Sequence, residues 1–224
     1  MNKDWSEKNK KMQALISKEA TFAEGIKLLI DLRAELFEQI TSIVKTFPAV
    51  AFYQMPFGAG EGSHRTTLAW SLWHTFRIED IVAHELILKD KQIFFEGDWK
   101  KKTKASIITT GNELTGEDLV EFSKKLDIKA TYDYCKSVMD STNEMLKRLK
   151  FADLKTQFTE EDKNRLIKTK SVSTAESAVW LIDYWCSKNI KGLIQMPFSR
   201  HWIMHVEAMQ RIINRLTKNP QFKF

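Results

Sequence analysis

The chain has 224 residues, 43% hydrophobic and 29% charged, with a formal net charge of +6. That length buries a sizeable core, and two cysteines are too few for a disulfide framework, so we expect buried thiols. The first residues lack an apolar signal segment, and no apolar run approaches the roughly 20 residues that cross a bilayer, so we expect a cytoplasmic protein with no membrane partner. No linker-like run rich in Pro, Gly or Ser appears, so we predict one domain over residues 1–224 with its core at about 21–218.

Eight glycines and four prolines are few breakers for this length, which favours long helices. The first long helix is predicted to begin at Thr21, which forms a capping pattern with Glu24, and to end at Pro48. The loop 49–63 follows. Its Gly-Ala-Gly-Glu-Gly run lacks the Lys-Ser/Thr of a P-loop, so phosphate binding is the lesser alternative. The second long helix, from about 66 to 89, is apolar on more than one side and should be buried.

The second half of the chain alternates long connections with helices. Short helices are predicted after Thr115 and Thr159, on either side of a third long helix at about 127–150 that Asp127 caps.

The pattern Ser173-x-x-Glu176 opens a further helix, which Gly192 and Pro197 break. Ser199 is placed to cap the last helix, which runs to about Lys218. No convincing strand alternation appears, and we predict an all-α fold, a four-helix bundle with additional short helices.

Two histidines four residues apart, His201 and His205, lie near the C-terminus. Residues at i and i+4 share one helix face, and two imidazoles so placed can hold one transition-metal ion. A third histidine, His74, lies within the second helix, where a bundle partner could supply it. Three neutral imidazoles leave a coordination position open, as in catalytic sites. The alternative is a set of core histidines bonded to carbonyl groups.

The other two histidines are not expected to be ligands. His84 is ten residues beyond His74, which turns it about 80° around the helix axis and moves it about 15 Å along it. His64 lies in the preceding loop, where it could line the mouth of a pocket.

A family resemblance rests on four features. The first two are a roughly four-helix layout and a second-helix histidine within Thr-Leu-Ala-Trp-Ser-Leu-Trp-His-Thr-Phe-Arg-Ile-Glu-Asp (67–80). The others are a long connection before the third helix and a His-x-x-x-His pair opening the last helix. This arrangement resembles the DinB-like, or YfiT-like, superfamily of metal-dependent four-helix-bundle enzymes over about residues 21–218. The resemblance implies that His74, His201 and His205 bind a divalent transition metal (Zn, Ni, Fe or Co). It differs at Gly192 and Pro197, which indicate an inserted segment.

Characterised members of that superfamily include transferases that use low-molecular-weight thiols. By resemblance, we favour a metal-dependent transferase in which a metal-bound thiolate attacks a small electrophile. Arg77, one turn from His74, could hold an anionic group of the thiol cofactor, and its alternative is a salt bridge. The sequence identifies no further catalytic residue.

Three other functions remain open. One is a metal-dependent hydrolase with water at the open position, and another is a non-catalytic metal- or ligand-binding protein of the stress response. The third is nucleic-acid binding. We do not expect it, because the excess charge is scattered lysine and the one tight cluster, 100–104, is typical of a solvated loop.

Three further expectations concern the surroundings of the site. The acidic residues nearest the motifs, as partners for ligand imidazoles, are Glu79, Asp80, Asp183 and Glu207, and Glu207 should be solvated. The repeated Gln-Met-Pro-Phe at 54–57 and 195–198 is either coincidence or two loops lining one pocket mouth. The 7 Trp and 14 Phe exceed what a small bundle easily buries, so we predict a homodimer.

Overall fold

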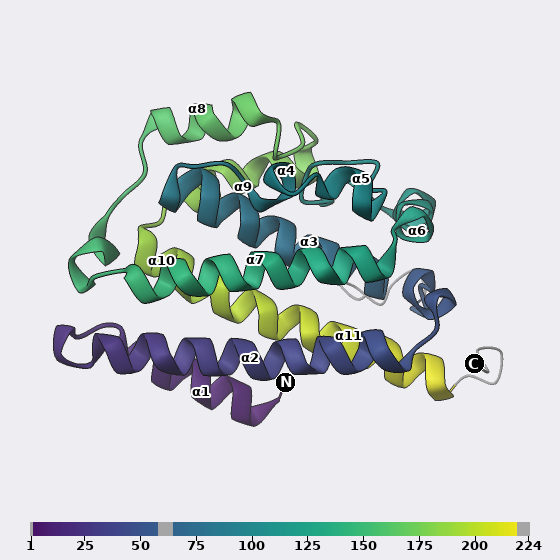
Figure 1. The fold of residues 1–224 in the computed structure, drawn as a ribbon, viewed down its shortest axis with the longest axis horizontal. Helices are drawn as coiled ribbons and strands as arrows, with labels where there is room; N and C mark the ends of the chain where they lie inside the picture. The colour runs from purple at the N-terminus through teal and green to yellow at the C-terminus, as the bar shows by residue number, and fades with distance from the viewer. Residues whose placement is uncertain (1, 58–64, 219–224) are drawn as a thin grey trace.

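The computed structural model describes residues 2–57 and 65–218, so the glycine run at 58–62 and His64 lie outside the described residues (Figure 1). The α-helices are α1 Lys3–Leu15, α2 Phe22–Thr46, α3 Leu68–Ile81, α4 Ile93–Glu96, α5 Trp99–Thr103, α6 Gly116–Lys125, α7 Ile128–Arg148, α8 Glu160–Thr169, α9 Glu176–Cys186, α10 Ile190–Gln195 and α11 His201–Lys218. In these ranges no strand forms, only an isolated bridge between Gln157 and Asn189. The all-α prediction is confirmed.

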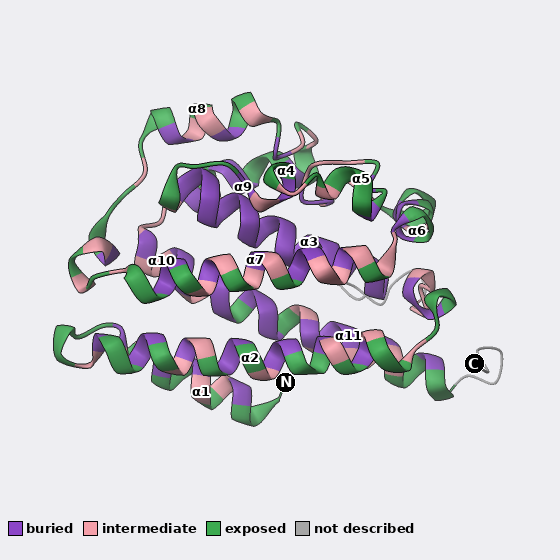
Figure 2. Ribbon diagram, viewed as in Figure 1, coloured by how far each residue is buried: buried purple, intermediate pink, exposed green. Residues whose placement is uncertain are grey.

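The longest helices surround the core. Helix α3 packs against α7 and α11, α2 packs against the same two, and α1 lies along α2 (Figure 1). Every residue of α3 is buried, as its two-sided apolar pattern predicts, and Figure 2 shows it as a continuous buried ribbon. Both cysteines, Cys135 and Cys186, are buried free thiols, as predicted. None of the helices in the described ranges combines the length and apolarity needed to span a membrane.

Several predicted helix ends are confirmed. The Asp127 side chain accepts a hydrogen bond from the Ala130 amide (3.0 Å), and α8 begins at a capping box formed by Thr159 and Asp162. Helix α2 begins directly after Thr21, but the Thr21 hydroxyl donates to the Leu15 carbonyl (2.7 Å) instead of capping the helix. The tight turn from α1 holds this hydroxyl, so the predicted capping box does not form.

The segment before the histidine pair differs most from its prediction. Gly192 lies inside α10, and a π-helical turn, Met196–Arg200, joins α10 directly to α11. Pro197 is tolerated because it lies at the start of that turn, where its missing N–H is not needed. Ser199 does not cap a helix, because its hydroxyl donates to the carbonyls of Ile194 (2.9 Å) and Gln195 (3.0 Å). No loop therefore separates α10 from α11, and the π-helical turn between them fixes the position of His201.

Candidate metal centre

The three histidines predicted as ligands lie together between α3 and α11. One ring nitrogen from each of His74, His201 and His205 lies within 4.8 Å of the others. The Nε2 atoms of His74 and His201 are 3.2 Å apart. His205 lies one turn after His201, with their ring centroids 4.4 Å apart, as the i, i+4 spacing predicts. The packing of α3 against α11 brings the third imidazole to the pair.

The hydrogen bonds around these rings favour a cation. His74 Nδ1 lies 2.9 Å from the Thr110 carbonyl oxygen, so this nitrogen carries the proton and Nε2 presents a lone pair. That lone pair faces Nε2 of His201, which donates a hydrogen bond to it in one tautomer of His201 and presents a second lone pair in the other. Nδ1 of His201 is buried without a hydrogen-bond partner. Two imidazoles on one tetrahedral zinc ion, with Zn–N bonds of about 2.0–2.1 Å, place their nitrogens about 3.3–3.4 Å apart. The residues present therefore fit a divalent ion.

Burial keeps the three imidazoles neutral at neutral pH. Removal from water lowers the pKa of His74 to about 4, although the hydrogen bond to Thr110 opposes the shift. Burial and the neighbouring His74 hold the pKa of His201 well below its usual value. The pKa of His205 is lowered by burial of its ring and by His201 and His74. Neutral imidazole is the form that binds metals.

A short stretch of the long α5–α6 connection positions α3, and the sequence did not indicate this role. Successive carbonyls of residues 109–111 accept from Trp73 Nε1 (3.1 Å), His74 Nδ1 (2.9 Å) and Trp70 Nε1 (2.8 Å). Trp70 also stacks on the His74 ring, with centroids 4.3 Å apart and planes 11° apart. Gly111 has φ of 78°, and a Cβ there would lie 3.0 Å from Trp70, so glycine is required. The Thr-Thr-Gly-Asn run was the available turn signal.

Arg77 is not placed to hold a cofactor. Its fully buried guanidinium donates to Asp80 (2.9 Å), Tyr134 (3.0 Å), Gln92 (2.8 Å) and the Ile108 carbonyl (2.6 Å). Every nitrogen is engaged within the protein, which corresponds to the salt-bridge alternative. We therefore leave Arg77 out of the candidate site.

The acidic residues considered as partners of the ligands also lie elsewhere. Glu79 binds Arg33 and Trp202, Asp80 binds Arg77, and Asp183 pairs with Lys163 at the surface. A carbonyl, not a carboxylate, holds His74. Glu207 is not solvated as predicted, because it accepts from the Asn2 amide and pairs with Arg211.

His84 has other partners. Its Nδ1 lies 2.6 Å from Asp90 and its Nε2 lies 3.1 Å from the Ser141 hydroxyl, so neither nitrogen is available to a metal. The Ser141–His84–Asp90 chain links α7 to the π-helical segment Val82–Leu88, which follows α3 and contains His84.

A cavity of about 210 Å³ adjoins the histidines, with His74 and His201 in its wall. Met196 and Pro197, from the second Gln-Met-Pro-Phe copy, also line it. No residue of the first copy, 54–57, lines this cavity. The ring centroid of its Phe57 lies 6.0 Å from the guanidinium carbon of Arg215. Arg215 is about 21 Å along α11 from His201, since fourteen residues separate them. The two copies therefore do not line one mouth.

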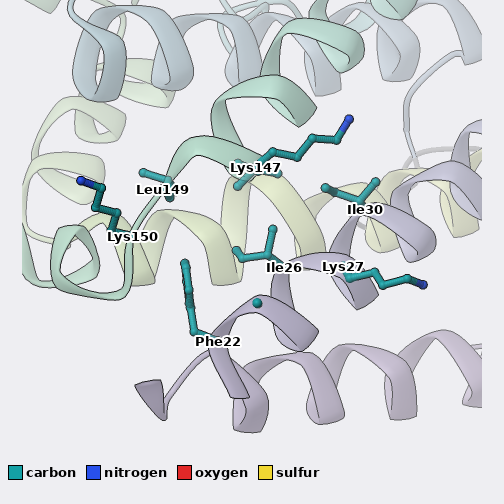
Figure 3. Close-up of a pocket in the computed structure, with 9 residues that line it drawn as sticks. Phe22, Ile26, Lys27, Ile30, Lys147, Leu149 and Lys150 are labelled. Atoms are coloured by element: carbon teal, nitrogen blue, oxygen red, sulfur yellow. The ribbon is translucent and has the colours of Figure 1, made fainter. Parts of the chain in front are cut away.

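A larger cavity of about 430 Å³ lies between α2 and the end of α7. In Figure 3, Phe22 and Ile26 face Leu149 across it, while the amino ends of Lys27 and Lys147 extend away. None of its lining residues is a histidine, cysteine or carboxylate. It offers apolar surface but no metal-binding groups, so the smaller cavity beside the histidines is the candidate site.

Comparisons with known proteins bear on the fold alone. No family model matches the chain, and no curated protein matches it. A solved structure of similar fold is described as the conserved protein of locus from Enterococcus faecalis, with a TM-score of 0.59 and 13% sequence identity. The alignment covers 86% of this chain and 97% of that one. This helical arrangement therefore occurs in another protein of very different sequence.

Proposed function

We propose that the protein is an enzyme that binds one divalent transition-metal ion through His74, His201 and His205 and uses this ion in catalysis. The observation that carries the proposal is the pair of Nε2 atoms 3.2 Å apart, with His201 Nδ1 buried and unpartnered. A shared cation suits the His201 tautomer in which both Nε2 atoms present lone pairs, and His205 supplies a third nitrogen within 4.8 Å. Zn, Ni, Fe and Co all suit three imidazoles.

An ion held there supplies a Lewis acid that lowers the pKa of a thiol or water at its open position. The protein contributes neutral imidazoles, the Thr110 carbonyl that fixes the His74 tautomer, and the Trp70 ring that stacks on His74. The reaction proposed is transfer of a low-molecular-weight thiol to a small electrophile, in a four-helix bundle of the DinB-like type. We place it in the cytoplasm, where such thiols remain reduced.

The first test is metal content. Protein purified without a histidine tag and reconstituted with Zn²⁺, Ni²⁺, Fe²⁺ or Co²⁺ should hold one ion per chain by elemental analysis. His74→Ala, His201→Ala and His205→Ala should each weaken binding by orders of magnitude and keep the helical content of the parent. A parent that binds no ion after reconstitution removes the basis of the proposal.

The second test separates the three functional alternatives. The loaded protein is assayed with a chromogenic electrophile, with and without a low-molecular-weight thiol, and with a chromogenic ester. Thiol-dependent turnover supports the transferase, and ester turnover without thiol supports the hydrolase. Tight metal binding with neither activity favours the non-catalytic binding protein. Absence of binding to nucleic acid at low salt excludes the remaining alternative.

The homodimer stays a prediction with weaker motivation than the composition gave it. Five of the 7 tryptophans are buried within the chain: Trp5, Trp70, Trp73, Trp185 and Trp202. The bundle thus covers most of the aromatic surface that suggested a partner. A monomer mass by light scattering across micromolar concentrations would reject the dimer.

A further inference from the structure

The cavity beside the histidines has a composition that restricts its ligand. Helix α9 supplies four of the ten lining residues, Trp180, Leu181, Tyr184 and Trp185. Apart from the two histidines, the Tyr184 hydroxyl and the two indole N–H groups, the one polar side chain of the lining is Asn112, and no charged side chain belongs to it. The proposed ion would be the only charge at this cavity, so an ionised group buried away from the ion would have no counter-charge, which is strongly unfavourable.

The size of the cavity sets an upper limit on the body of the ligand. A 150 Å³ apolar cavity is large enough for benzene, so about 210 Å³ accommodates one ring with a few further atoms. Three aromatic side chains in the wall favour a flat or compact apolar body, because ring faces and edges pack well against one another. A complete peptide-like thiol cofactor is too large and too charged to be the occupant.

The exposure of the aromatic side chains gives the cavity a direction. Trp180 is 49% exposed and Trp185 is 1% exposed, so the cavity runs from a surface mouth to a closed interior wall. At the mouth, Trp180 packs edge-on against Tyr184 with centroids 5.5 Å apart, and Lys188 lies 4.2 Å from the Tyr184 ring centroid. A molecule entering past Trp180 meets His74 and His201, the two ligands in the wall.

We infer that this cavity binds the substrate body, a small uncharged molecule with a single-ring-sized apolar portion, whose polar atom approaches the ion from the His74 and His201 side. The inference rests on the proposed function and adds the chemical class of the substrate to it. The low-molecular-weight thiol then approaches from outside this cavity. The segment 176–200, in which Gly192 and Pro197 indicated an insertion, thereby acquires a role as the substrate wall.

The test uses two probes that differ in one charge. Benzyl alcohol presents a hydroxyl to the ion and an apolar ring to the cavity, and 4-(hydroxymethyl)benzoate adds a carboxylate at the far end of the ring. Because a carboxylate also binds zinc directly, the deciding measurement uses the zinc-free full chain, by ligand-observed NMR and calorimetry, with the zinc-loaded chain measured beside it. We expect benzyl alcohol to bind the zinc-free chain at least tenfold more tightly than its carboxylate. Equal affinity of the zinc-free chain for the two probes, or preference for the carboxylate, overturns the inference.

Two variants locate the binding. Met196→Trp fills the cavity from the π-helical turn and should weaken benzyl alcohol binding at least tenfold. Tyr184→Ala removes an aromatic ring from the cavity wall without filling the cavity, and it should weaken benzyl alcohol binding several-fold. The control is Val179→Trp, an addition of similar size at an exposed position of α9 that does not line this cavity. All three should retain one ion per chain. Unchanged affinity in both Met196→Trp and Tyr184→Ala overturns the assignment.

Failure of the inference and failure of the proposed function give different results. One ion per chain without benzyl alcohol binding sinks the substrate class and leaves the metal centre standing. Benzyl alcohol binding that depends on Met196, in a protein that holds no ion, sinks the metal function and supports the cavity as a site for uncharged rings.

Discussion

Helix α3 carries two kinds of buried polar side chain, and they differ in how completely they are paired. The Glu79 carboxylate accepts hydrogen bonds from both terminal nitrogens of Arg33 (2.8 and 2.7 Å) and from the indole N–H of Trp202 (2.6 Å). Arg33 also donates to Asn143 and to the Phe198 carbonyl. Each charge has a counter-charge and each donor an acceptor, so this cluster is complete without a ligand.

The histidine cluster on the same helix is incomplete. His74 has one nitrogen held by Thr110, but its other nitrogen faces His201 Nε2, and His201 Nδ1 has no partner. Burial removes His201 Nδ1 from water without supplying a hydrogen bond in return, which is unfavourable for folding. The completed cluster of Arg33, Glu79 and Trp202 therefore joins α2, α3 and α11, whereas the incomplete histidine cluster has the capacity to bind a ligand.

Breaking the completed cluster should have the largest effect on stability. Glu79→Ala leaves the Arg33 guanidinium buried without its carboxylate, and losses of about 3–5 kcal/mol are typical of such changes. Urea unfolding of the metal-free protein measures the loss. The control is Asp31→Ala, which removes the exposed partner of Lys27 and should change stability by less than about 0.5 kcal/mol. A loss below about 1 kcal/mol in Glu79→Ala would contradict the structural role.

Completing the incomplete cluster should have the next largest effect. With free Zn²⁺ at about a thousand times its Kd, binding to the folded state alone raises the free energy of unfolding by about 4 kcal/mol. His201→Ala should lose this gain and, without metal, should be destabilised less than Glu79→Ala. Urea titrations with zinc and with a chelator measure both quantities. If zinc stabilises His201→Ala as much as the parent, His201 is not a ligand.

The sequence predicted the parts of the fold and site that depend on local pattern. The periodicity around Leu29, Leu72 and Val138 gave the long helices, because one apolar face per helix must be buried. The pair His201 and His205 shares a face by helix geometry alone, and the third histidine followed from a motif in the second helix. These features need no knowledge of distant contacts.

The features that the sequence did not predict depend on long-range contacts. The Thr110 carbonyl that holds His74 comes from an irregular connection, and any residue type presents a carbonyl, so its position carries no sequence signal. Spacing places Arg77 one turn from His74, which suggested contact with a cofactor. The direction of its guanidinium is set instead by hydrogen bonds to Asp80, Tyr134 and Gln92, which spacing does not reveal. Pro197 indicated a break, yet the π-helical turn accommodates it.

The stability of the metal-free protein should depend on pH, because the histidine cluster, unlike the Arg33–Glu79 pair, contains a buried neutral base. Burial lowers the pKa of His74 in the folded protein to about 4, below its ordinary value of 6.5, so the unfolded state binds more protons between these values. Stability should be complete above pH 6.5 and fall as the pH decreases toward 4, by on the order of 3 kcal/mol for His74 alone. His74→Gln should show a shallower fall in urea titrations from pH 7 to pH 4.5. Equal slopes would show that His74 does not titrate as a buried neutral base.

The smallest effect is expected at His84, which is buried like His74 and His201 but has hydrogen-bond partners for both ring nitrogens. Both of its ring nitrogens already have partners, Asp90 and Ser141, and it lies about 15 Å along the helix from His74. His84→Ala should therefore leave metal content at one ion per chain by elemental analysis and lower stability by about 1 kcal/mol for each lost hydrogen bond. If His84→Ala abolishes metal binding while His74→Ala does not, incompleteness of hydrogen bonding does not identify the ligands of this protein.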